Sequence, residues 1–184
     1  MIKRGKRNFF NWNFRGQVWI ETVIYTLIAF VLIGLILAFA RPKIEELQDQ
    51  AILQKSTSMM KDIDSTILTM GAAGNQRVLE LSIQKGDLKI DGINDEMIFE
   101  MQSQSVYSEP GKNISDGDLT VLTIPESGYN LVTLTRNYSS DYDLEIDGAD
   151  TVKTINAAST SYQLSILNEG QAADGRTILN ISVE

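Results

Sequence analysis

The feature that most constrains this chain is a run of 19 residues, Thr22 to Ala40, that is rich in Ile, Leu, Val and Phe and contains no charge. At about 1.5 Å per residue, a helix of this length spans about 28 Å, close to the hydrocarbon core of a bilayer. Burial inside a soluble domain would need a large surrounding core, and the rest of the chain is too polar to supply one. The run therefore predicts a transmembrane helix, which we place at 17–40.

A short basic leader precedes this helix. Residues 1–16 contain five Lys or Arg side chains and no acidic one. Because positive charge is retained in the cytoplasm, this asymmetry predicts a cytoplasmic N-terminus and an extracellular C-terminal part. Cleavage after Ala38-Phe39-Ala40 by a signal peptidase is the alternative, but the apolar run is longer than the ~7–15 residues usual in a secretory signal.

The composition excludes several classes of function. Residues 17–184 carry 11 basic and 24 acidic side chains, a net charge of −13, which disfavours binding to nucleic acid. The chain has no Cys and no His, so thiol nucleophiles, imidazole bases, disulfides and the common zinc and haem sites are excluded. No P-loop or Gly-x-Gly-x-x-Gly motif occurs. The sequence predicts neither an enzyme nor a cofactor or metal site.

A single acidic residue, Glu21, stands at the start of the apolar helix. A carboxylate costs up to ~3 kcal/mol at the centre of a bilayer, and less near the interface. At headgroup level it would be harmless and would stabilise the helix N-terminus through the helix dipole. A functional role requires a cationic partner.

The junction Arg15-Gly16-Gln17, followed by Glu21, resembles the class III signal peptide of archaeal type IV pilin-like proteins. In that family a basic leader ends in Lys/Arg-Gly or Lys/Arg-Ala, and a prepilin peptidase cuts just before a Gln. The mature chain then carries Glu at its fifth position. The resemblance implies cleavage between Gly16 and Gln17, and retention of the apolar helix.

The resemblance also implies a role in assembly. Cleavage would create an α-amine on Gln17, with a pKa near ~7.7, which Glu21 could pair with on its own or a neighbouring chain. Pairing would offset the cost of burying both charges. The expected partners are further copies of the chain in a cell-surface filament, the prepilin peptidase, the pilus assembly machinery and the membrane. The alternative is a single-pass anchored extracellular β domain that does not polymerise, such as a minor pilin, an adhesin or a binding module.

A second helical segment follows the apolar run. Pro42 predicts a kink or a brief break in the helix, or else the first residue of a second helix. Apolar residues recur at helical spacing over 41–70, which predicts an amphipathic helix with a polar gap from Gln54 to Ser58. Gly71-Ala72-Ala73-Gly74 is expected to end it.

Residues 75–184, here called the head, have the pattern of short strands separated by Gly, Asn, Asp and Pro. No long amphipathic helix interrupts them. This pattern predicts an α+β fold, in which the long N-terminal helix precedes a mainly antiparallel β-sandwich or barrel. Strands are predicted at 79–83, 88–90, 97–101, 118–125, 129–138, 142–147, 160–168 and 176–184.

The acidic stretch Asp141 to Asp150 invites comparison with a calcium-binding loop. Aligned from Asp143, the loop has Gly148 at position six, but position twelve is Thr154 where a bidentate Glu is needed. The alternation instead predicts a strand that points Tyr142, Leu144 and Ile146 inward and its acids toward solvent.

Three Asn-x-Ser sequons, at Asn113, Asn137 and Asn180, are candidate N-glycosylation sites on a segment expected outside the cell. The pilin-like family that the junction resembles is often glycosylated. Asn113, beside Pro110-Gly111, is the best candidate, and Asn180 is the least suited because it lies within a predicted strand.

Overall fold

The structure is a computed structural model that describes the backbone of residues 14–184 and the side chains from Trp19 onward. The contacts divide the chain into an N-terminal unit, Met1–Lys43, and a C-terminal unit, Ile44–Glu184. Most of the predicted leader, residues 1–13, lies outside the described residues.

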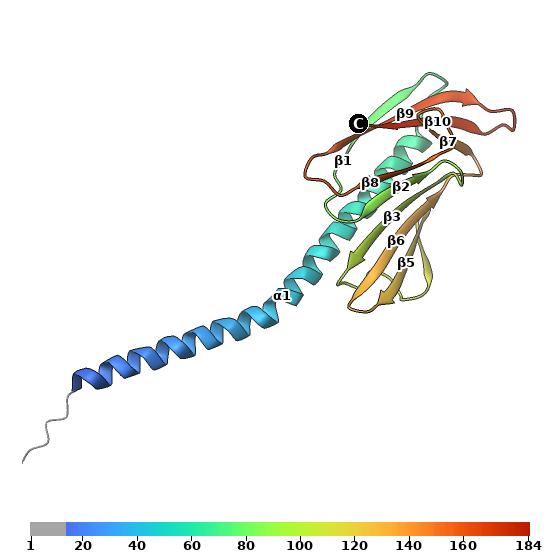
Figure 1. The fold of residues 1–184 in the computed structure, drawn as a ribbon. Coiled ribbons are helices and arrows are strands. Elements are labelled where there is room, and N and C mark those ends of the chain that lie inside the picture. Colours follow the sequence, from blue (N-terminus) through green and yellow to red (C-terminus); the bar gives the residue numbers. More distant parts are fainter. Residues whose placement is uncertain (1–13) are drawn as a thin grey trace, which may run out of the picture. The chain divides into compact units, whose positions relative to one another are not determined.

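One helix, α1, runs from Phe14 to Leu68 (Figure 1). Pro42 lies inside it, so the expected break or restart of the helix at Pro42 is wrong. Proline removes one backbone donor, but its fixed φ of about −65° is that of a helix. The helix ends at Leu68, close to the predicted stop at Gly71.

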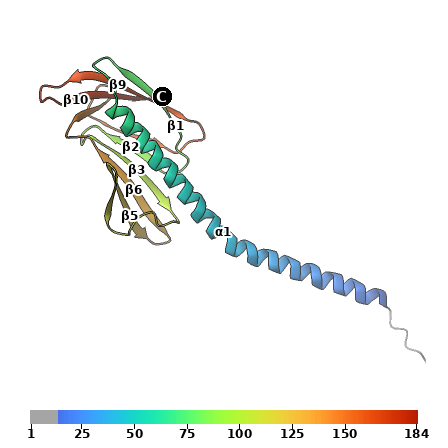
Figure 2. The ribbon, with the colours of Figure 1, turned by 180° about the vertical axis from the view of Figure 1, so that it is seen from behind.

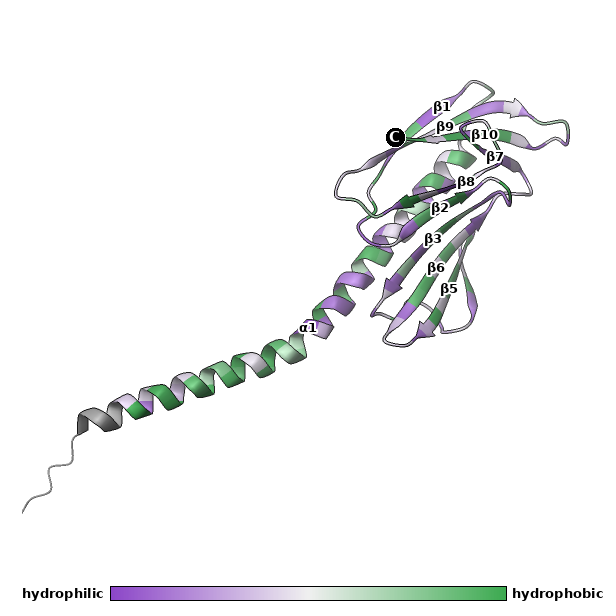
Figure 3. Ribbon diagram, in the orientation of Figure 1, coloured by the Kyte–Doolittle hydropathy of each residue, from purple (hydrophilic) through white to green (hydrophobic). Residues whose placement is uncertain are grey.

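In the N-terminal unit, α1 is apolar around its whole circumference. Every side chain from Trp19 to Phe39 is exposed, and Figure 3 shows this stretch mostly in the colour of hydrophobic residues. Among the described residues, α1 is long and apolar enough to cross a membrane. This N-terminal apolar helix is compatible with membrane anchoring.

The head forms two sheets, which confirms the α+β fold with a mainly antiparallel β part (Figure 1). The smaller sheet has the strand order β1-β9-β10-β7, and the larger has the order β4-β5-β6-β3-β2-β8. The strands are β1 Gln76–Leu81, β2 Asp87–Asp91, β3 Glu96–Ser103, β4 Asn113–Asp116, β5 Leu119–Glu126, β6 Tyr129–Asn137, β7 Tyr142–Ile146, β8 Val152–Asn156, β9 Tyr162–Gln171 and β10 Thr177–Val183.

The strand pairing is antiparallel except where β10 lies parallel to β7. The C-terminal strand β10 pairs with β9 on its other side, so the strand predicted at 176–184 is confirmed. Two strands were not predicted, β4 and β8. Both are short edge strands with mostly exposed side chains, and such strands carry little of the alternation that marks a half-buried strand.

The C-terminal turns of α1 and the inner faces of both sheets share one hydrophobic core (Figure 2). The helix contributes Leu53, Met60, Ile63 and Ile67, all nearly inaccessible to solvent. The predicted polar gap belongs to this buried face, because Thr57 is buried and its hydroxyl is bonded to the carbonyl of Leu53 and the hydroxyl of Tyr107. Small polar residues are tolerated in a buried helix face when their hydroxyl groups are hydrogen-bonded.

Buried polar groups fix this part of α1 to the head. Asp49 accepts hydrogen bonds from the ammonium of Lys85 at 2.6 Å and from the backbone N–H of Gln104 at 2.7 Å. After the helix ends, Asn168 of β9 holds the connecting loop. Its side-chain amide donates to the carbonyl of Gly71, and its backbone carbonyl accepts from the N–H of Gly74. Each bond satisfies a group that the core would otherwise leave unpaired.

Candidate functional site

The predicted processing site lies at the beginning of α1. Arg15, Gly16 and Gln17 have helical backbone, and their side chains lie outside the described residues. Cleavage before Gln17 therefore stays a prediction.

Glu21 is the first described acidic residue of α1, and it has a partner that the sequence reasoning missed. The hydroxyl of Tyr25 donates a hydrogen bond to Glu21 Oε1 at 3.1 Å. Residues four apart lie on the same helix face, and helical side chains lean toward the N-terminus, so Tyr25 naturally reaches back to Glu21. The i, i+4 spacing was visible in the sequence and was the signal that could have found it.

A neighbouring polar side chain in the apolar stretch, that of Thr26, forms its hydrogen bonds with the backbone of its own helix. The hydroxyl of Thr26 donates to the backbone carbonyls of Thr22 and Val23, at 3.0 and 2.9 Å. A hydroxyl bonded in this way adds little cost to an apolar environment, because its donor is already used. The stretch thus keeps an apolar surface despite its Thr residues.

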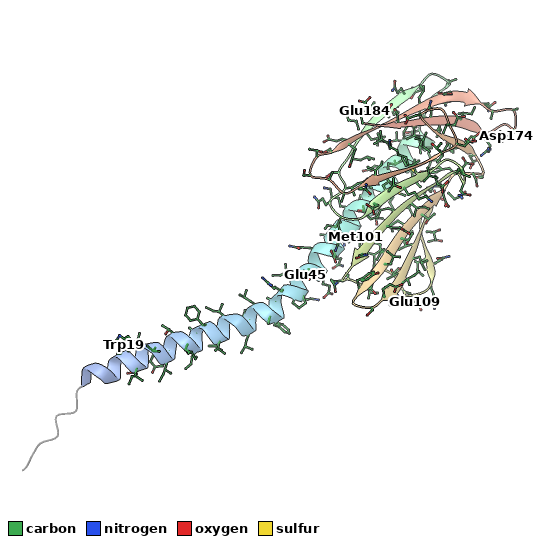
Figure 4. The ribbon with its side chains drawn as sticks, in the orientation of Figure 1. Trp19, Glu45, Met101, Glu109, Asp174 and Glu184 are labelled. Carbon is green, nitrogen blue, oxygen red and sulfur yellow. The ribbon has the colours of Figure 1, made fainter. Side chains whose placement is uncertain are left out.

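The apolar surface of α1 is large, and every described side chain on it from Trp19 to Phe39 is exposed. The side chain of Trp19 is 74% exposed, and that of Phe39 at the far end is 83% exposed. Figure 4 shows side chains projecting from the helix on all sides from Trp19 onward. An apolar surface of this extent is compatible with lipid or other apolar helices around it.

The acidic stretch forms strand β7. The inward orientation predicted for its apolar residues is confirmed for two of the three. Leu144 and Ile146 are buried, while Tyr142 is half-buried. Its acids are also half-buried rather than fully solvated. Burial, with Glu169, Asp150 and Asp143 next in importance, raises the pKa of Glu145 above its ordinary value.

An arginine compensates part of this acidic charge. Arg176 lies 3.4 Å from Asp143 and 2.6 Å from Asp95, and it also pairs with Asp174 at 2.7 Å. In the part of the chain that the structure describes, no group of three or more acidic side chains is arranged to hold a metal ion. Of the two acids of β7, Asp143 is paired with Arg176.

Asp95, which the sequence reasoning did not single out, is the centre of that pairing. Its backbone has a φ of 52°, a left-handed conformation that Asp tolerates better than most residues. One carboxylate oxygen accepts from the N–H of Leu144 at 2.8 Å, and the other accepts from Arg176 at 2.6 Å. These bonds join the β2–β3 turn to β7 and to the start of β10.

The three sequons lie in different surroundings. Asn113, in β4, and Asn137, at the end of β6, are exposed, and the amide oxygen of Asn137 accepts from both the N–H and the hydroxyl of Ser139. Asn180, in β10, is half-buried. Its amide nitrogen donates to Glu169 at 2.7 Å, and its amide oxygen accepts from the N–H of Gly148.

The fold and the helix together define a class of protein with an N-terminal apolar helix, compatible with membrane anchoring, and a β-rich head of two sheets. The chain matches no protein-family model, no curated protein and no solved structure.

Proposed function

We propose that this chain is a structural subunit of an archaeal type IV pilus-like surface filament. A prepilin peptidase cleaves before Gln17, and the apolar helix is retained. Its work is assembly and not catalysis. Before assembly the subunit is held in the membrane by residues 17–40, and afterwards these helices form the filament core with the heads outside.

The observation that carries the proposal is the exposed apolar helix with its single early carboxylate. All described side chains from Trp19 to Phe39 are exposed, and Glu21 is the only charged residue among them. Lipid covers such a surface in the monomer, and neighbouring copies of the same helix cover it in a filament. The Arg15-Gly16-Gln17 junction adds the processing signal.

The proposed orientation follows from charge. Five cations in residues 1–16 favour a cytoplasmic N-terminus, so the head is placed outside the cell. Glu21 then lies near the cytoplasmic end of the helix. There it pairs with the α-amine of Gln17 in a neighbouring subunit, which compensates both charges in an apolar bundle.

The second candidate function is a membrane-anchored β domain that stays monomeric. The same apolar helix favours it, because one exposed span needs only lipid around it. A minor pilin, an adhesin or a binding module would all have this architecture. Two measurements separate these candidates: the N-terminal residue of the protein from cells, and the filament yield of Glu21 variants.

The first experiment determines the N-terminus of the protein isolated from cells, by mass spectrometry. A start at Gln17 supports prepilin processing. A start at Arg41 identifies an ordinary secreted protein, and a start at Met1 identifies a simple anchor. Either of the last two results contradicts the proposal.

The second experiment compares filament yield in cells that express Glu21→Ala with the wild type. We expect a loss of filaments with normal membrane insertion, because the N-terminal amine loses its partner. Glu45→Ala is the matched control, since Glu45 is an acidic residue on the same helix beyond the apolar run. Wild-type yield from Glu21→Ala contradicts the pairing role.

A further inference from the structure

The carboxylate of Glu21 has one described neighbour that can donate a hydrogen bond to it from its own helix. The positions one turn away are Gln17, Val18, Ile24 and Tyr25, and of these only the first and last carry side-chain donors. The Tyr25 hydroxyl lies 3.1 Å from Glu21 Oε1 in donating geometry. The pair therefore forms within one chain, without any neighbour.

We propose that Tyr25 is a positioning residue for Glu21. Its hydroxyl stabilises the carboxylate in the unassembled subunit and fixes the direction in which the carboxylate points. The role in assembly rests on the proposed function, whereas the bond itself does not require filaments.

The environment decides how much such a bond matters. Tyr25 is 62% exposed and is surrounded along the helix by Ile24, Leu27 and Ile28, so lipid and not water would contact this face in a membrane. A polar group in apolar surroundings costs free energy unless it is hydrogen-bonded. The Tyr25 hydroxyl thus offsets part of this cost within the subunit, before a cation from a neighbour arrives.

Glu21 also has a second carboxylate oxygen that can receive that cation. The Tyr25 bond uses Oε1, and a carboxylate has a second oxygen with its own lone pairs. Oε2 can accept from an ammonium group while Oε1 stays with Tyr25. Tyr25 therefore directs one oxygen toward a neighbouring subunit and does not compete with it.

The test uses the full chain, unassembled, in phosphatidylcholine vesicles at neutral pH. Dicyclohexylcarbodiimide is an apolar reagent that labels carboxyl groups in apolar surroundings, and mass spectrometry of the peptide that contains Glu21 gives the labelled fraction. We expect Tyr25→Phe to raise this fraction about two- to tenfold, the range for losing one hydrogen bond. Tyr25→Gln, which restores a donor at the same spacing, should reverse the increase.

The matched control is Thr26→Val, which removes an adjacent hydroxyl that is bonded to the helix backbone and not to Glu21. It should leave the labelling of Glu21 unchanged. Equal labelling in Tyr25→Phe and in the wild type overturns the inference, and so does an equal increase in Thr26→Val. Circular dichroism of the vesicles verifies that each variant keeps its helix.

The assembly role is tested by a double-mutant cycle of filament yield with Tyr25→Phe and Glu21→Gln. We expect Tyr25→Phe to lower the yield alone and to have no further effect in the Glu21→Gln background. An additive effect shows that Tyr25 acts independently of Glu21 and overturns the inference. Wild-type yield from Glu21→Gln contradicts the proposed function, while the labelling result still decides whether the Tyr25–Glu21 bond operates.

Discussion

The guanidinium of Arg136 in β6 donates a hydrogen bond to Asp64 of α1, with 2.6 Å between Nε and Oδ1. Both side chains are mostly buried, at 18% and 14% exposure. The same guanidinium lies 4.9 Å from the centre of the Tyr138 ring. This pair fixes the last turns of the helix to the larger sheet.

Removing Asp64 should destabilise the C-terminal unit strongly. Asp64→Ala leaves Arg136 buried without its carboxylate, and losing one partner of a buried pair typically costs about 3 kcal/mol. The measurement is urea unfolding of the full chain in micelles, followed by near-UV circular dichroism of its tyrosines. The control is Asp116→Ala, which breaks the half-exposed pair of Asp116 with Lys61 on the same helix. Asp116→Ala should lose less than about 1 kcal/mol of unfolding free energy, because its pair is exposed to solvent. Equal losses in the two variants would contradict the claim that burial makes the Asp64–Arg136 pair the more important one.

Asp91 should stabilise the head only above acidic pH. The Lys89 ammonium that donates to it, assisted by Asn94, holds the pKa of the Asp91 carboxyl below its usual value. A lowered folded-state pKa contributes stability that is present above the unfolded value of about 3.9 and is lost as the pH falls through the folded value.

Asp91→Asn is therefore expected to cost about 1–3 kcal/mol at pH 7, because the carboxylate also accepts from the N–H groups of Ile93 and Asn94. The cost should shrink as the pH falls toward 2 and the wild-type carboxyl takes up its proton. Unfolding midpoints in urea at both pH values measure this, and a cost that is the same at both contradicts the electrostatic explanation.

The sequence predicts those parts of the fold whose signal lies within one element. The long helix, the alternation of β3 and β6 and the C-terminal strand were all predicted, because apolar spacing along one segment reports which face is buried. Asp49, Asp95 and Asn168 were not, since each is defined by groups 36 or more residues away that only the folded chain brings together. The Tyr25 partner of Glu21 was within reach, because it lies four residues along the same helix.

Glu145 should show the opposite pH dependence to Asp91. Burial, followed by Glu169, Asp150 and Asp143, raises the pKa of Glu145 above its usual value. A raised carboxyl pKa means that the folded state holds its proton more tightly, so stability falls as the pH rises from the unfolded value of about 4.3 through the folded one.

Glu145→Gln should therefore raise the urea midpoint at pH 7, by less than about 1 kcal/mol in unfolding free energy, because this half-buried strand is partly screened by solvent. At pH 3 the two proteins should unfold alike. Glu126→Gln serves as the control, since Glu126 is an exposed acid at the end of β5. A loss of stability in Glu145→Gln at pH 7 would show that the carboxylate is held by favourable contacts instead.

The three sequons should differ in glycan occupancy if the head is exported past an oligosaccharyltransferase. Asn113 and Asn137 are exposed and available, whereas the amide nitrogen of Asn180 already donates to Glu169 at 2.7 Å in a paired strand. Attaching a glycan to Asn180 in the folded head would break this bond and crowd the neighbouring strands β7 and β9. Glycopeptide mass spectrometry of the native protein should therefore find sugar on Asn113 and Asn137 and none on Asn180. If all three asparagines are unmodified, the prediction of glycosylation is wrong. If sugar is found on Asn180 alone, the preference for the exposed Asn113 and Asn137 is wrong.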